Sequence, residues 1–60
     1  MDISWNEYYL QVTDKIMETL GSNWRISTEE LAYIARWYNK DISVDNAVEV
    51  FFSVFYSNRG

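Results

Sequence analysis

The dipeptide Ile-Ser occurs three times in this chain of 60 residues, as Ile3-Ser4, Ile26-Ser27 and Ile42-Ser43. Ser is a favoured residue at the start of a helix, because its hydroxyl accepts a hydrogen bond from a backbone N–H of the first turn. Glu7 and Glu30 each follow a Ser by three residues, which is the spacing of a capping box, and Asn46 takes this place after Ser43. The Ile before each Ser occupies the position of a hydrophobic staple. The three pairs are unequally spaced, which argues against a structural repeat, and they predict three helix starts.

The apolar pattern predicts an all-α, compact three-helix bundle that forms a single domain over residues 1–60, with helices over about 5–20, 28–39 and 44–57. Gly21 follows the first of these ranges, where Gly is favoured just beyond a helix end. The segment VFFSVFY is also rich in strand-forming residues. A helix is the better interpretation, because the cap at Ser43 leads directly into this segment and no second strand is available to pair with it.

Apolar residues recur at helical spacing in each range, and they define three expected buried faces. These are Trp5, Tyr9, Val12, Ile16 and Leu20 with Tyr8 at the edge; Leu31, Ile34, Ala35 and Tyr38; and Val44, Ala47, Val48, Phe51, Val54 and Phe55. The third face is the widest, so we expect the third helix to be the most buried. Trp24 lies in the loop between the first two helices and is expected to cover the open end of the core.

Catalytic and metal-binding residue types are scarce. The chain has neither Cys nor His, which removes thiolate chemistry, the commonest metal ligand and the commonest general base. The capping Ser residues already have a structural role, and the pairs Asp14/Glu18 and Glu29/Glu30 are typical of ordinary surface charge. No Gly-rich phosphate loop or calcium-loop spacing is present. We therefore expect no enzymatic activity, no metal site and no cofactor.

The charge balance favours a protein partner. Nine acidic and five basic residues give a net charge of −4, which opposes direct binding to nucleic acid or to an anionic membrane surface. No apolar run is long enough to span a membrane, and the first residues lack the pattern of a secretory signal. Together with the absence of Cys, these features predict a cytoplasmic (intracellular) protein.

Several apolar residues lie outside the expected buried faces. Exposed apolar and aromatic clusters commonly mark a partner surface, although such side chains can also shield the core of a small bundle. The candidate partner-binding residues are Leu10, Met17, Tyr33, Trp37 and Phe52. A homodimer is one arrangement that would cover these faces.

Glu7, Asp14 and Glu18 are expected to line up as an acidic stripe on the first helix. The stripe is either a solvated helix face or a surface that binds a basic partner. The leading functional hypothesis is a small acidic, non-catalytic interaction module. Such a module would regulate or inhibit a larger protein, including a basic nucleic-acid-binding one, as small phage and mobile-element inhibitors do.

The alternative hypothesis is a helix-turn-helix DNA-binding regulator, formed by the second and third predicted helices. The first residues of its recognition helix would be Val44, Asp45, Asn46 and Glu49, and the helix would lack the basic residues that DNA binding needs.

Overall fold

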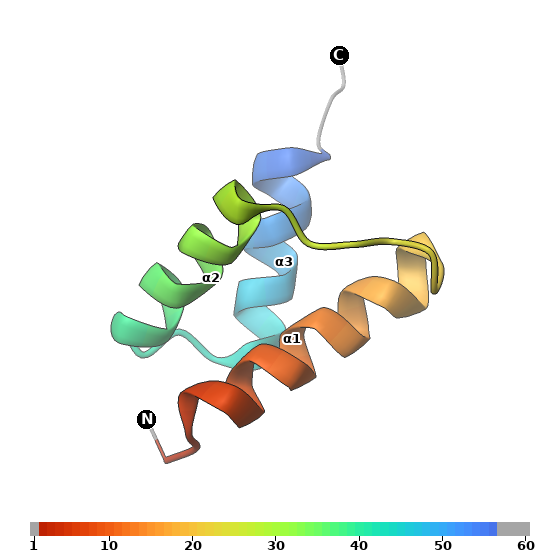
Figure 1. Ribbon diagram of the computed structural model, residues 1–60. Helices are drawn as coiled ribbons and strands as arrows, with labels where there is room; N and C mark the ends of the chain where they lie inside the picture. Colours follow the sequence, from red (N-terminus) through yellow and green to blue (C-terminus); the bar gives the residue numbers. More distant parts are fainter. Residues whose placement is uncertain (1, 57–60) are drawn as a thin grey trace.

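The computed structural model describes residues 2–56, which form three α-helices and no strand. The helices are α1 (Trp5–Leu20), α2 (Thr28–Asn39) and α3 (Val44–Phe55), as Figure 1 shows. The predicted all-α three-helix bundle is confirmed, and the segment that could have been a strand belongs to α3. The helix ends at Phe55, earlier than expected, and residue 57, where the sequence predicted its end, lies outside the described residues.

Each helix begins at one of the predicted Ser caps. The Ser Oγ atoms accept the backbone N–H groups of Glu7, Glu30 and Asn46, each at 3.2 Å. At Ser27 the reciprocal bond is also made, because Ser27 N donates to Glu30 Oε1 at 2.8 Å. The full capping box predicted at Ser4 is wrong, since the Glu7 carboxylate accepts the Gln11 amide at 3.4 Å instead.

The two connections end their preceding helices in different ways. Gly21 has φ 102° and ψ 159°, a backbone conformation that only Gly adopts without strain, and its N–H bonds to Met17 O. After α2, Asp41 takes the left-handed conformation, with φ 66°. The N–H groups of Asp41 and Ile42 donate to Tyr38 O and Trp37 O, each at 3.0 Å, which is the bonding pattern of a Schellman motif.

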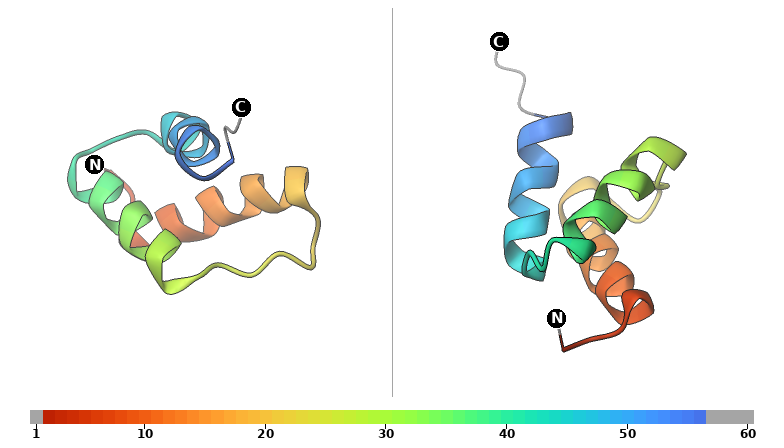
Figure 2. Two further views of the ribbon diagram at one scale, coloured as in Figure 1. Left: turned by 90° about the horizontal axis from the view of Figure 1, so that it is seen from above. Right: turned by 90° about the vertical axis from the view of Figure 1, so that its left-hand side faces the viewer.

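The helices pack at steep angles, and the loop over residues 21–27 runs back alongside α1 before α2 begins (Figures 1 and 2). Two tyrosine hydroxyls connect parts of the chain that are distant in sequence. Tyr8 on α1 donates to Ile42 O in the α2–α3 turn at 2.8 Å, and Tyr38 on α2 donates to Ile3 O before α1 at 2.9 Å. In two of the three Ile-Ser pairs, the Ile carbonyl group therefore accepts a hydrogen bond from a tyrosine of another element.

The core differs in part from the predicted faces. Its buried hydrophobic residues are Tyr8, Val12, Ile16, Ile34, Trp37, Ala47 and Phe51. Tyr8 lies at the centre rather than at the edge. Three members of the expected buried faces, Trp5, Leu31 and Val54, are exposed. The prediction that the third helix would be the most buried is wrong, because α1 buries four residues and α3 buries two.

The buried face of α2 is turned from the predicted one by slightly less than one residue step of about 100°. Glu30, Ile34 and Trp37 point into the fold, whereas Leu31 is exposed. The capping box is compatible with this rotation. The buried Glu30 carboxylate accepts the Ser27 N–H, and Trp37 is buried on the same side of the helix two turns later.

Burial raises the pKa of the Tyr8 phenol above its ordinary value of 10.0. Above that pH the unfolded chain loses the Tyr8 proton while the folded chain keeps it, so the free energy of unfolding falls as the pH rises. We expect urea unfolding between about pH 9 and pH 11 to show a steeper loss for the wild type than for Tyr8→Phe. The variant should be less stable by about 1–2 kcal/mol at neutral pH, because Ile42 O loses its donor. Parallel pH profiles for the two proteins would contradict this role of Tyr8.

No helix within residues 2–56 combines the length and the apolar character needed to cross a membrane.

Candidate functional site

Two of the five candidate partner-binding residues, Leu10 and Met17, lie together on the outer side of α1. Leu10 is 53% exposed and Met17 is half-buried. Both line a groove of about 270 Å³ between α1 and the loop over residues 21–27. The groove is lined by Tyr9, Leu10, Thr13, Met17, Trp24, Arg25 and Ile26.

The other three candidates lie elsewhere and do not extend this surface. Trp37 is only 6% exposed and belongs to the core, so its predicted place on the outer side of the second helix is wrong. Tyr33 is half-buried between helices, with ring centroids 6.0 Å from Trp37 and 5.3 Å from Phe55. Phe52 packs edge to face against Phe51 on α3, with the two ring centroids 5.5 Å apart. These aromatic side chains shield or build the core instead of forming one exposed cluster with Leu10.

Core packing holds the loop side of the groove in place. Trp24 is half-buried, and its ring meets Phe51 edge to face at 6.0 Å, as expected for a residue that covers the core. Ile26 also packs against the core, just before the cap at Ser27. The exposed Arg25 side chain is held by the loop, because its Nη1 donates to Ser22 O at 3.1 Å and to Trp24 O at 3.0 Å.

On the α1 side, Thr13 separates Tyr9 from Met17. Its hydroxyl donates to Tyr9 O at 2.9 Å and to Leu10 O at 3.2 Å. The hydroxyl of this buried side chain is therefore satisfied within the helix. The Thr13 methyl group is the part of the side chain that contacts its neighbours. The walls of the groove are mostly apolar, and this suits an apolar side chain from a partner.

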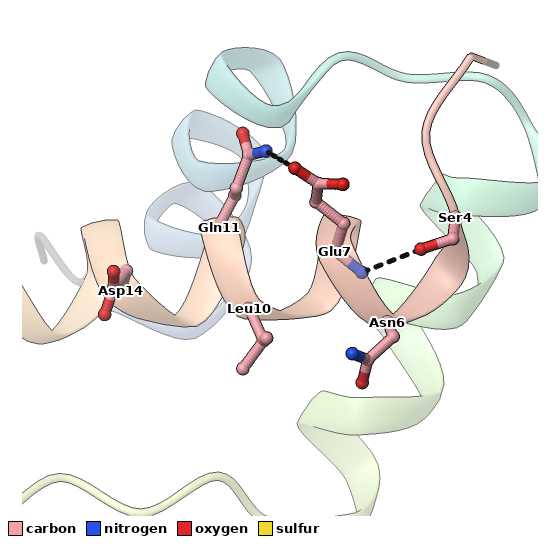
Figure 3. A pocket seen from close by; sticks show the side chains of 6 residues that line it. All are labelled: Ser4, Asn6, Glu7, Leu10, Gln11 and Asp14. Carbon is pink, nitrogen blue, oxygen red and sulfur yellow. Dashed lines mark hydrogen bonds between the residues drawn. The ribbon is translucent and has the colours of Figure 1, made fainter.

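A second hollow of about 430 Å³ lies next to the groove, along α1 and its cap. It is lined by Ser4, Asn6, Glu7, Leu10, Gln11 and Asp14 (Figure 3). Leu10 lines both the hollow and the groove, and in Figure 3 it projects from α1 together with Asn6, while Glu7 and Gln11 project from the neighbouring part of the helix surface. The hollow places two members of the predicted acidic stripe beside the apolar groove.

All three stripe residues, Glu7, Asp14 and Glu18, are exposed. Glu18 follows Asp14 by one helical turn, so the two carboxylates share one side of α1. Among residues 2–56, no Lys or Arg pairs with any of the three. The nearby Lys15 pairs instead with Asp45 at 3.8 Å, an exposed contact that contributes little to stability.

Within the described part of the chain, no three Asp or Glu side chains gather closely enough to hold a metal ion. The chain matches no known family model, no curated protein and no solved structure.

Sequence reasoning missed the part of the groove that comes from Tyr9, Thr13, Trp24, Arg25 and Ile26. One signal was available, because Trp24 and Ile26 are the apolar residues in an otherwise polar loop. The pattern predicted that Trp24 would cover the core, but it carried no information about which helix the loop would run beside.

Proposed function

We propose that this chain is a non-catalytic protein-interaction module that regulates or inhibits a larger intracellular protein. The observation that carries the proposal is the groove between α1 and the loop. It presents an exposed Leu10 among half-buried apolar side chains, next to carboxylates with which no Lys or Arg of residues 2–56 forms an ion pair. An apolar groove with a charged border is a common form of protein-binding surface.

The competing function is DNA binding by α2 and α3. The exposed residues at the start of α3 are Asp45, Asn46 and Glu49. Their two negative charges would face the phosphate groups of DNA, and such a contact is unfavourable. The same charges are compatible with a partner that is itself a basic, nucleic-acid-binding protein. A homodimer is also compatible with this proposal, through a face other than the acidic stripe.

The experiment that tests the proposal compares three immobilised proteins in an extract of the source cells, treated with nuclease. They are the wild type, Leu10→Asp in the groove, and Val54→Asp as a matched control. Val54 is 50% exposed and lies outside the groove, so both substitutions place a charge at a similarly exposed apolar position. Circular dichroism checks that each variant keeps its helices.

We expect a protein to be retained by the wild type and by Val54→Asp, and to be lost with Leu10→Asp. Retention of no protein above background, or equal retention by all three, would contradict a binding function at the groove. Random duplex DNA is tested in parallel. Micromolar binding that weakens steeply with salt would favour the helix-turn-helix function instead.

A further inference from the structure

The size of the groove limits what it can bind. Its volume of about 270 Å³ is below the range of about 300–1,000 Å³ that is typical of small-molecule pockets. The neighbouring hollow is larger, but its walls all come from α1 and the cap before it. A surface of this form suits one apolar side chain of a docked polypeptide, with the rest of that polypeptide lying across α1.

The charge beside the groove decides which polypeptide fits. Glu7, Asp14 and Glu18 run along α1 for about three helical turns, and no Lys or Arg among residues 2–56 forms an ion pair with them. Among the described residues that line the groove, Arg25 is the one basic residue, and it lies on the loop side, where two loop carbonyl groups hold its Nη1 atom. The exposed surface of α1 beside the groove therefore carries a negative charge.

A second copy of the chain is a poor occupant for the same reason. Two copies related by a two-fold axis at this face would bring their acidic stripes together, and like charges at close range oppose association. A chain segment with Lys or Arg beside an apolar anchor has the opposite charge pattern. Its basic residues would meet the stripe while the anchor enters the groove beside Leu10.

We infer that the groove between α1 and the loop binds a basic amphipathic helix of the partner protein. An apolar anchor of that helix lies among Leu10, Met17 and Trp24, and its Lys or Arg residues face the acidic stripe. This inference rests on the proposed interaction function and specifies the chemistry of the partner. Helix-in-groove recognition uses apolar residues spaced by about one turn. Here one of them enters the groove and the others lie across α1, and complementary charge increases the association rate.

The test is a titration of the ¹⁵N-labelled protein with a synthetic Leu/Lys peptide of about five helical turns, with Leu at helical spacing on one face. We expect amide shifts at Leu10, Thr13, Met17 and Ile26 and at the Trp24 indole. Two matched peptides serve as controls, one with Glu in place of Lys and one with Ala in place of Leu. Neither should bind measurably, and raising NaCl from about 0.05 to 0.5 M should weaken the Leu/Lys complex.

Matched variants separate specific docking from general attraction to an acidic protein. Asp14→Asn with Glu18→Gln should weaken peptide binding by about fourfold or more, since each charge contributes about two- to fivefold. Glu29→Gln with Glu49→Gln removes the same charge at other exposed positions and should leave the affinity near that of the wild type. Leu10→Ala should weaken binding by about tenfold or more, since the anchor loses an apolar contact, and Val54→Ala should not.

Equal weakening by the two charge pairs, or shifts centred on α3, would overturn the inference. The same conclusion holds if the Glu peptide binds as well as the Lys peptide. If the wild type retains a cellular protein through Leu10 but does not bind the basic peptide, the interaction function stands and the basic helix is wrong. If neither binds, both proposals fail.

Discussion

Replacing Trp37 with Ala is expected to lower the free energy of unfolding by about 3–5 kcal/mol. The indole is only 6% exposed, and it lies in the core cluster with Ile34 and Phe51. Its removal leaves a cavity that the surrounding helices cannot fill without moving. Small domains have a total stability of about 0.05–0.15 kcal/mol per residue, so this variant is expected to be close to unfolding at room temperature.

The measurement is urea unfolding followed by circular dichroism. Trp37→Phe keeps part of the volume and provides a folded variant with a smaller loss. Leu10→Ala is the surface control, and it should change the free energy of unfolding by less than about 1 kcal/mol, because Leu10 is 53% exposed. A loss at Trp37 that is no larger than the loss at Leu10 would mean that Trp37 is not a core residue.

Replacing Phe51 with Ala is expected to have a similar effect, a loss of about 3–5 kcal/mol. Phe51 has no exposed surface and is the aromatic centre of the core. Its ring centroid lies 6.0 Å from that of Trp24 and 5.0 Å from that of Phe55. Aromatic pairs of this kind add to the stabilisation that comes from buried area.

The Phe51 substitution has a second expected consequence, at the groove. Trp24 forms part of the groove wall and packs edge to face on Phe51. Phe51→Leu, which retains most of the apolar volume, should stay folded while Trp24 loses its aromatic partner. We expect the Trp24 indole resonance to move toward its solvent-exposed position and binding at the groove to weaken. An unchanged Trp24 resonance in a folded Phe51→Leu protein would show that the loop is held in place by other contacts.

The helix starts could be predicted closely because capping is a local interaction. Ser27 and Glu30 are three residues apart, and the bonds between them depend only on the geometry of one helical turn. The sequence predicts the end of α2 near residue 39, but it does not predict the backbone conformation that ends the helix. Asp41 adopts the left-handed conformation there, and an Asp in this position gives a weaker sequence signal than a Gly.

The faces of the helices could be predicted only in part. The apolar spacing of Leu31, Ile34, Ala35 and Tyr38 predicts a buried face of α2 that leaves Trp37 outside it, and a charged Glu30 gives no sign of burial. A carboxylate can lie on the inner side when its charge is satisfied by a backbone N–H, as at Ser27. The residue pattern also predicts Tyr8 at the edge of a buried face, and its polar hydroxyl has no partner nearby in the sequence. Its hydroxyl reaches Ile42 O, and that partner is distant in the sequence.

The number of helices, the residue at which each begins and the negative charge along α1 follow from the residue pattern alone. These properties depend on residue type and on contacts within one or two turns. Three other features depend on how the helices and loops pack: Trp37 is a core residue, Leu10 and Met17 line one groove with Trp24, and this groove borders the acidic stripe. Those facts depend on the path of the loop beside α1 and on contacts between elements distant in the chain, and a residue pattern carries no information about either.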